Sequence, residues 1–149
     1  LFLLSDPGCY RNVEVAVVDG DGKVIHQPPK WQMVTPFMQH FFRELSSVWT
    51  SGDALDVAAY ALWRINWIHP FKNGNGRTAR AFAYACLCIK MGVQLPGRES
   101  MIDLITRNRD KYEGALKEAD KSPLRQPNLA PMRAFLDEML QRQIQSSQP

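Results

Sequence analysis

A polar, glycine-rich loop between two apolar helical segments constrains this sequence most. The residues from His69 to Arg80 include one histidine, two glycines and two arginines within twelve positions. The segment before them keeps helical periodicity up to Ile68, and residues 79–91 are almost wholly apolar, which predicts a buried helix. A loop in this position costs stability unless its backbone groups find partners, so we expect it to bind a ligand.

The residue types in this loop favour a phosphate ligand. Gly74 and Gly76 can adopt positive φ without steric cost, and alternating handedness around Asn75 would turn successive N–H groups inward as an anion-binding nest. A helix beginning near Gly76 would add its positive N-terminal dipole. Arg77 and Arg80 share one face of that helix, and guanidinium groups suit phosphate oxygens. The loop is interpreted as a polyphosphate site, with the preceding histidine as a candidate proton acceptor.

This stretch resembles the signature of the Fic domain family. The family pattern is His-x-Phe-x-(Asp/Glu)-Gly-Asn-Gly-Arg-x-x-Arg, and residues 69–80 match it at every fixed position except one. Gly8-Cys9-Tyr10-Arg11 and His26-Gln27-Pro28-Pro29 are similar to the lead-in and the flap of the family, and Ile105–Ala119 is similar to a later helix. The resemblance covers roughly residues 8–120 and implies a mainly α fold, a bundle of about six helices with a β-hairpin flap.

Length and composition predict one globular domain. The 149 residues are 45% hydrophobic with mixed charge, which suits a single domain over residues 1–149. The net charge of +3 comes without a basic tract, so no nucleic-acid partner is expected. No apolar run is long enough for a membrane span, and no signal peptide is visible. Three cysteines, a sparse and odd set, favour a reducing compartment, either the cytoplasm or the host cytosol of a secreted effector.

The N-terminal part predicts a β-hairpin. Residues 13–18 are rich in β-branched side chains and read as a strand, Asp19-Gly20-Asp21-Gly22 as the turn, and residues 23–26 as the return strand. In Fic proteins this flap aligns a target segment by strand addition, so the resemblance implies that role here. A purely structural hairpin is the alternative. The flap residues expected to contact the target are Val13, Val15, Val17, Val24, Ile25 and His26.

Capping signals predict the first two helices. Thr35 followed by Pro36 predicts an N-cap and a first helical residue, so a helix is expected over residues 37–49. Asp53 is expected to cap a second helix over residues 54–68.

The later helices follow from similar signals. The proline after His69 ends the preceding helix and leaves this histidine projected at a helix end. Gly92 predicts a left-handed cap for the next helix. One or two helices are expected over residues 99–119, and a final helix over about residues 131–145. Tyr112 is interpreted either as part of a nucleobase pocket or as a packed side chain.

The activity implied by the resemblance is the transfer of AMP from ATP to a hydroxyl group of a target protein. A Ser, Thr or Tyr hydroxyl is a poor nucleophile until a base removes its proton, and a histidine is mostly neutral near pH 7. The motif assigns His69 as this general base. Position by position, it implies that the Gly74–Gly76 amides, Asn75 and Arg77 hold the α- and β-phosphates. Arg80 is expected to reach the γ-phosphate.

Asn73 departs from the family pattern, which has Asp or Glu here to hold Mg²⁺. An amide oxygen is a weaker ligand for this ion than a carboxylate, and the adjacent Lys72 adds positive charge. Three outcomes are open: a weakened Mg²⁺ site, partial replacement of the metal by Lys72 or Arg77, or transfer of another phosphate-containing group or of nothing. We favour retained AMP transfer with a weakened Mg²⁺ site. A catalytically weakened or inactive nucleotide- or peptide-binding module is the alternative.

The same sequence bears on how the domain is regulated and on which other enzyme classes it excludes. Family members are often restrained by a helix with the pattern Ser/Thr-x-x-x-Glu-(Gly/Asn), but Arg109 stands where Glu113 would require Ser or Thr. The restraint is therefore expected in a preceding segment, since the chain begins at Leu1, or on an antitoxin-like partner, or nowhere. Gly76 and Arg80 argue against the kinase branch of this superfamily, and the missing Gly-Lys-Ser/Thr excludes a P-loop NTPase.

Overall fold

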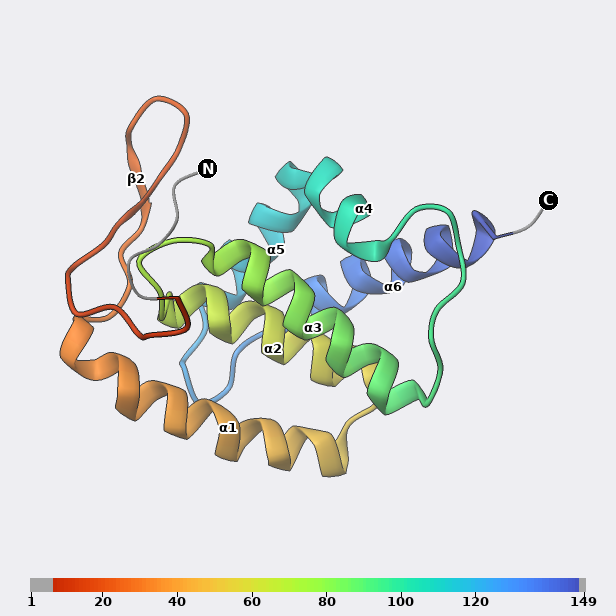
Figure 1. Cartoon of the computed structure of the whole chain (residues 1–149), viewed down its shortest axis with the longest axis horizontal. Helices are drawn as coiled ribbons and strands as arrows, with labels where there is room; N and C mark the ends of the chain where they lie inside the picture. Colours follow the sequence, from red (N-terminus) through yellow and green to blue (C-terminus); the bar gives the residue numbers. More distant parts are fainter. Residues whose placement is uncertain (1–6, 148–149) are drawn as a thin grey trace.

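Helix α2 (Ala54–Ile68) is the centre of the fold. It is buried on most of its circumference, with Val57, Leu62, Trp63 and Ile68 fully inside the core. It packs against α1 (Val34–Ser51), α3 (Asn75–Met91) and α6 (Ala130–Gln145), and α6 in turn contacts α4 (Met101–Arg107) and α5 (Arg109–Asp120) (Figure 1). Helices α2 and α3 run side by side in opposite directions, so the loop between them lies at one end of the pair (Figure 1). The candidate ligand loop is therefore held between two well-packed helices.

The computed structural model describes residues 7–147. Within them, six helices and a two-stranded antiparallel hairpin confirm the mainly α fold. The elements in chain order are β1 (Val17–Val18), β2 (Val24–His26), a 3₁₀ turn (Trp31–Met33), α1 (Val34–Ser51), α2 (Ala54–Ile68), α3 (Asn75–Met91), α4 (Met101–Arg107), α5 (Arg109–Asp120) and α6 (Ala130–Gln145). None of the described helices is long and apolar enough to cross a bilayer.

The predicted cap of α2 is confirmed. The carboxylate of Asp53 accepts hydrogen bonds from the backbone N–H groups of Leu55 at 2.9 Å and Asp56 at 3.0 Å, and Asp56 accepts one in return from the N–H of Asp53 at 3.1 Å. This reciprocal capping box satisfies donors that the first helical turn leaves unpaired. Arg133 on α6 hydrogen-bonds the same carboxylate and lowers the pKa of Asp53 to about 2. The left-handed cap predicted at Gly92 is also confirmed, with φ of 69°.

The predicted N-cap of α1 is wrong. The helix begins at Val34, with Met33 rather than Thr35 as its N-cap, and no side chain caps it. The preceding 3₁₀ turn winds directly into the helix, so the cap residue Met33 has a helical rather than an extended backbone, with φ of −88° and ψ of −7°. Pro36 falls inside the first turn, where backbone N–H groups have no intrahelical acceptor and a missing donor costs nothing.

The hairpin is shorter than predicted. Only Val17–Val18 of the expected strand over residues 13–18 pairs with β2, and the register is irregular between these two residues. Side chains take the earlier carbonyls instead: Arg11 Nη1 donates to Val13 O at 3.1 Å, and Gln27 Nε2 donates to Val15 O at 3.1 Å. The prolines that follow Gln27 also stop the return strand. The hairpin projects from the helical body (Figure 1).

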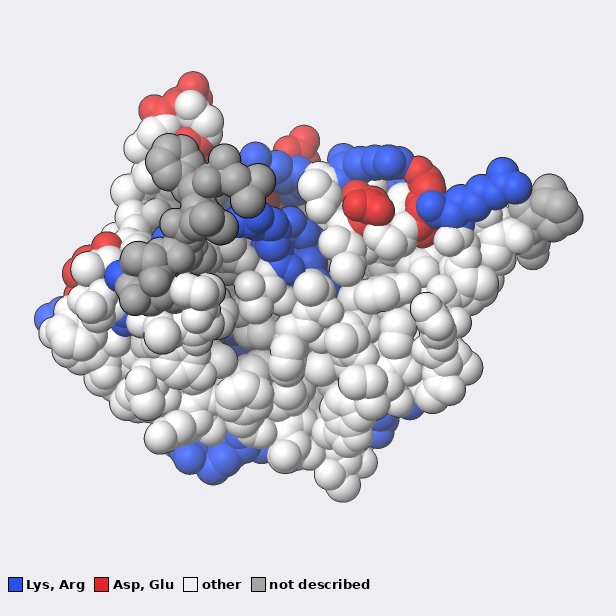
Figure 2. Space-filling model, in the orientation of Figure 1, with Lys and Arg blue, Asp and Glu red and all other residues white. Residues whose placement is uncertain are grey.

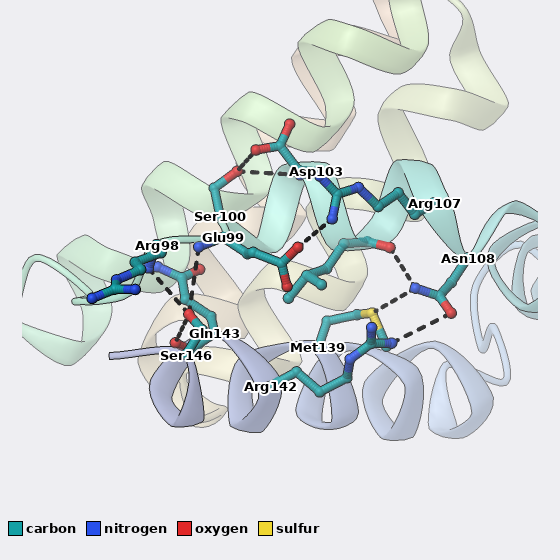
Figure 3. A network of polar contacts seen from close by, with 11 residues as sticks. Arg98, Glu99, Ser100, Asp103, Arg107, Asn108, Met139, Arg142, Gln143 and Ser146 are labelled. Carbon is teal, nitrogen blue, oxygen red and sulfur yellow. Dashed lines mark hydrogen bonds and ion pairs between the residues drawn. The ribbon is translucent and has the colours of Figure 1, made fainter. Parts of the chain in front are cut away.

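A buried glutamine ties α4 to α6. Gln143 is 2% exposed; its Oε1 accepts from the N–H of Met101 at 2.6 Å, and its Nε2 donates to the Tyr84 hydroxyl at 2.9 Å. Ser100 caps α4 by accepting from the N–H of Asp103 at 3.2 Å (Figure 3). Helices α4 and α5 confirm the expectation of one or two helices over residues 99–119, and α6 begins one residue before the predicted position.

Candidate functional site

His69 lies one residue beyond the end of α2. Its backbone is left-handed, with φ of 53° and ψ of 59°, a conformation otherwise found only at glycines among residues 7–147. The imidazole Nδ1 lies 3.1 Å from the carbonyl oxygen of Asn66. Because a carbonyl oxygen only accepts hydrogen bonds, Nδ1 carries the proton of the neutral ring. Nε2 is therefore left with its lone pair, which is the state that a general base requires.

The surroundings of His69 keep its imidazole neutral. Burial lowers the pKa of His69, and the nearby His26 and Arg11 lower it further. The hydrogen bond to Asn66 O has the opposite effect and raises the pKa, but burial is the largest influence. The rings of His26 and His69 lie 6.4 Å apart. A neutral histidine at physiological pH can accept a proton, so the electrostatics agree with the tautomer.

Asn75 organises the loop through its side chain. Its Oδ1 accepts from the N–H of Phe71 at 2.8 Å, and its Nδ2 donates to the carbonyl oxygen of the same residue at 2.8 Å. The residue is 2% exposed. Both polar atoms of the amide are therefore engaged within the loop, and the group that Asn75 can offer to a phosphate is its backbone N–H at the start of α3.

The two glycines of the loop serve different purposes. Gly74 is left-handed with φ of 80°, as predicted, but Gly76 does not adopt positive φ, because it is already the second residue of α3. The expected alternation of handedness is therefore wrong. A Cβ at Gly74 would lie 3.4 Å from Arg77 Nη2, and one at Gly76 would lie 3.3 Å from Arg80 Nη1. The glycines thus let both guanidinium groups fold back over the N-terminus of α3.

A cavity of about 440 Å³ opens over this loop. We call it the phosphate cavity; it brings together most of the predicted site. Its lining comprises Val15, Ala16, Val17, Val18, His69, Lys72, Asn73, Gly74, Asn75, Gly76, Arg77 and Arg80. Among these described residues three are Lys or Arg and none is Asp or Glu. Figure 2 shows Lys and Arg side chains gathered in the recess between the hairpin and α4. Such a cavity attracts anions.

A second, smaller cavity of about 130 Å³ shares His69 with the first. We call it the inner cavity. It is mainly apolar, and it lies between the flap, the end of α2, and α5. Its lining comprises Val17, Ile25, His26, Asn66, Trp67, His69, Tyr112, Glu113, Leu116, Lys117 and Asp120. His69 therefore stands on the wall common to a cationic cavity and an apolar one.

Both interpretations of Tyr112 are compatible with its position. Its ring stacks on Phe135 with centroids 6.2 Å apart, and its hydroxyl accepts from Asn66 Nδ2 at 2.8 Å. Burial raises the pKa of Tyr112 to about 12, so the phenol stays protonated. The side chain is packed and also lines the inner cavity. The sequence does not predict a role for Asn66, because a polar residue in an apolar helix does not indicate that His69 and Tyr112 are its hydrogen-bond partners.

The predicted flap residues divide between three environments. Val13 and Val24 are exposed to solvent, at 47% and 52%. Val15 lines the phosphate cavity, Val17 lines both cavities, and Ile25 lines the inner one. His26 also lines the inner cavity; its Nε2 donates to Trp67 O at 3.0 Å, so this side chain faces the helices. A contact of these residues with a target stays a prediction.

Asn73 does not provide a ready metal ligand. Its side chain is exposed, and its Oδ1 already accepts from the N–H of Gly74 at 2.6 Å. Across residues 7–147 no group of three or more His, Cys, Asp or Glu side chains is placed to hold a metal ion. Mg²⁺ prefers carboxylate oxygens in near-octahedral geometry. The residues present therefore do not fit a Mg²⁺ ion held by the protein itself.

Comparison with known proteins identifies the family. The model of the Fic/DOC family matches residues 2–87, which include the whole loop from His69 to Arg80. The chain belongs to the Fic/DOC family. Members of this family are typically nucleotidyltransferases, and they use nucleotide substrates with Mg²⁺.

Relatives that are named protein adenylyltransferases match part of this Fic domain. It is 34% identical over 101 residues to the protein adenylyltransferase Fic of Drosophila persimilis and, equally, to that of Drosophila pseudoobscura pseudoobscura. The match spans 67% of this chain but only 18% of those relatives. A Fic domain containing signaling protein from Bacteroides thetaiotaomicron has a similar structure, with a TM-score of 0.72 and 21% identity, over 93% of this chain and 52% of that one. The structural likeness shows the fold.

Proposed function

We propose that this Fic domain transfers AMP from ATP to a Ser, Thr or Tyr hydroxyl of a target protein. One observation carries the proposal: His69, with its Nε2 lone pair free, lies on the wall between a cationic cavity and an apolar cavity. A nucleotide has a charged half and a flatter, less polar half, and the two cavities match this division. The similarity to the Drosophila protein adenylyltransferases supports the same reaction.

The phosphate cavity supplies the binding and the electrostatic stabilisation. Backbone N–H groups of the first turn of α3 line this cavity and would donate to a bound phosphate, and the helix dipole favours negative charge there. Arg77 and Arg80 fold over the same helix end and offer charge-assisted hydrogen bonds. Nε of Arg80 is buried and makes no hydrogen bond with the described protein atoms, so this donor could be satisfied by a phosphate oxygen.

The chemical step requires one proton transfer. Nε2 of His69 removes the proton of the target hydroxyl, and the hydroxyl oxygen then attacks the α-phosphorus of ATP. A new oxygen–phosphorus bond forms while the bond from the α-phosphorus to the bridging oxygen breaks. Pyrophosphate leaves with the electron pair, and Arg77 and Arg80 stabilise its charge. The inner cavity would hold the nucleoside half, and the flap would present the target beside His69.

Intact-mass spectrometry tests this function. The domain is incubated with ATP and Mg²⁺ alongside a His69→Ala variant and a His40→Ala variant, which removes a histidine of α1 that lines neither cavity. The assay detects self-modification, so we expect the mass of the domain to rise by one AMP group in the wild type and in His40→Ala. The rate in His69→Ala should fall by roughly 10²–10⁴-fold. Gain of a single phosphate instead would indicate a kinase-type transfer.

A nucleotide-binding module with weakened catalysis is the second candidate. It is favoured by Asn73, whose amide oxygen is engaged by Gly74 and offers no carboxylate to a metal. The Asn73→Asp variant separates the two functions in the same assay. AMP addition only in Asn73→Asp would mean that the wild-type domain binds nucleotide without transferring it.

A further inference from the structure

Arg11 closes the open end of helix α2. The last carbonyl groups of a helix have no intrahelical donor, and a glycine cap is the usual remedy. Here Arg11 Nε donates to His69 O at 2.8 Å, and its Nη2 lies 3.4 Å from Ile68 O. The backbone N–H of Arg11 donates to Pro70 O at 2.8 Å. One residue thus engages three successive carbonyl groups around the candidate base.

The same guanidinium also contacts the backbone at both ends of the flap. The flap is the segment Val13–His26, and one of the two contacts lies just beyond its end. Nη1 donates to Val13 O at 3.1 Å where the flap begins, and Nη2 donates to Pro29 O at 2.5 Å just after it ends. Arg11 is 2% exposed, and its acidic neighbour, Glu14, lies 3.6 Å away with a side chain that is 54% exposed. The guanidinium of this buried arginine donates mainly to backbone carbonyl oxygens. It therefore fixes the positions of these backbone segments more than it neutralises a negative charge.

His69 needs such support. A left-handed backbone at a residue other than glycine is strained and persists only where its surroundings hold it. The side-chain contact between Nδ1 and Asn66 O depends on that backbone, and it determines which nitrogen remains free to act as base. His26 adds a tie from β2 to the same helix end, through Trp67 O at 3.0 Å.

We propose that Arg11 is a positioning residue for the transfer reaction, because its guanidinium fixes the backbone of His69 relative to both ends of the flap. The distance and orientation between the base and the flap that presents the target are thereby kept constant. The kinetic part of this inference rests on the proposed AMP transfer. Arg11 lines neither the phosphate cavity nor the inner cavity. Its loss should therefore impair the chemical step while leaving the affinity for ATP unchanged.

The test uses Arg11→Lys, which keeps the positive charge but replaces the planar fork with a single ammonium group. The chain has three histidines, so the ring nitrogen signals in a ¹⁵N NMR spectrum can be assigned with His→Gln variants. The wild type should show His69 as the Nδ1–H tautomer, and Arg11→Lys should show a mixture of both tautomers. The rate of AMP transfer should fall by about 10- to 100-fold, since small displacements of a catalytic group have effects of this size. The dissociation constant of ATP should stay unchanged.

Arg43→Lys provides the matched control, because Arg43 is exposed on α1 and lines neither cavity. It should change neither the tautomer nor the rate. An Arg11→Lys domain that only melts at a lower temperature, with the tautomer of His69 and the rate per folded molecule unchanged, would overturn the proposal. A marked loss of ATP affinity would also contradict it. If the wild type transfers no AMP, the proposed function fails, but the tautomer measurement still decides whether Arg11 positions His69.

Discussion

Replacing Asn75 by alanine should destabilise the whole domain. The side chain of Asn75 makes two hydrogen bonds of 2.8 Å to the backbone of Phe71, and the residue is buried. Alanine would leave the N–H and the C=O of Phe71 without these partners. Each unsatisfied buried group costs about 1–3 kcal/mol, and part of this cost is recovered if water reaches the loop. We therefore expect the free energy of unfolding to fall by about 2–4 kcal/mol.

Urea denaturation of Asn75→Ala and of Asn12→Ala measures this difference. Asn12 is exposed in the segment before the hairpin, so its variant should stay within about 0.5 kcal/mol of the wild type. The affinity of Asn75→Ala for ATP should also fall, because the loop that frames the phosphate cavity loses its internal support. Unchanged stability with a large loss of ATP affinity would refute this reasoning and would mean that the Asn75 side chain contacts the phosphate directly.

The transfer rate should depend on pH through His69. Burial lowers its pKa below the usual value of about 6.5, so the rate should rise with pH to a plateau, with its midpoint below about pH 6.5; a midpoint above that value would contradict the assignment. Because the unfolded chain protonates this histidine first as the pH falls, the wild type should lose stability relative to His69→Gln below about pH 6.5, as measured by urea denaturation. Asn73→Asp should bind ATP more tightly with Mg²⁺ than with a chelator, whereas the wild type should show little difference in titrations; equal behaviour would refute the role given to the missing carboxylate. Asp53→Ala should lower the free energy of unfolding by about 1–2 kcal/mol through loss of the α2 cap, against no change in Ser46→Ala, and two equal melting curves would contradict it.

Local signals account for what the sequence could predict. Asp53 and the proline after His69 are start and stop signals that act within a few residues, and the observed helix α2 begins and ends where they indicate. The loop motif is also local, so the position of His69 at a helix end and of Arg77 and Arg80 at a helix start could be predicted. Gly92 ends α3 for the same reason.

Side-chain hydrogen bonds to the backbone and the pairing of strands account for what the sequence could not predict. Arg11 lies 58 positions before His69, and nothing in its neighbourhood indicates that its side chain closes a helix end. The loop motif does not reveal that the side chain of Asn75 turns back to the backbone of Phe71, which gives both polar atoms of this buried amide a partner. A contact of Asn75 with a phosphate stays a prediction. The strand over residues 13–18 was predicted from side-chain types alone, whereas its length is set by which carbonyl groups find a strand partner.

The proposed function requires His69 to activate a hydroxyl group for attack on the α-phosphorus of ATP. The most direct test is parallel incubation of the wild type and of His69→Ala with ATP labelled at either the α- or the γ-phosphorus, followed by measurement of label bound to protein. We expect protein-bound label from α-labelled ATP only, and only with the wild type. Protein-bound label from γ-labelled ATP, or equal α-label in His69→Ala, would contradict it.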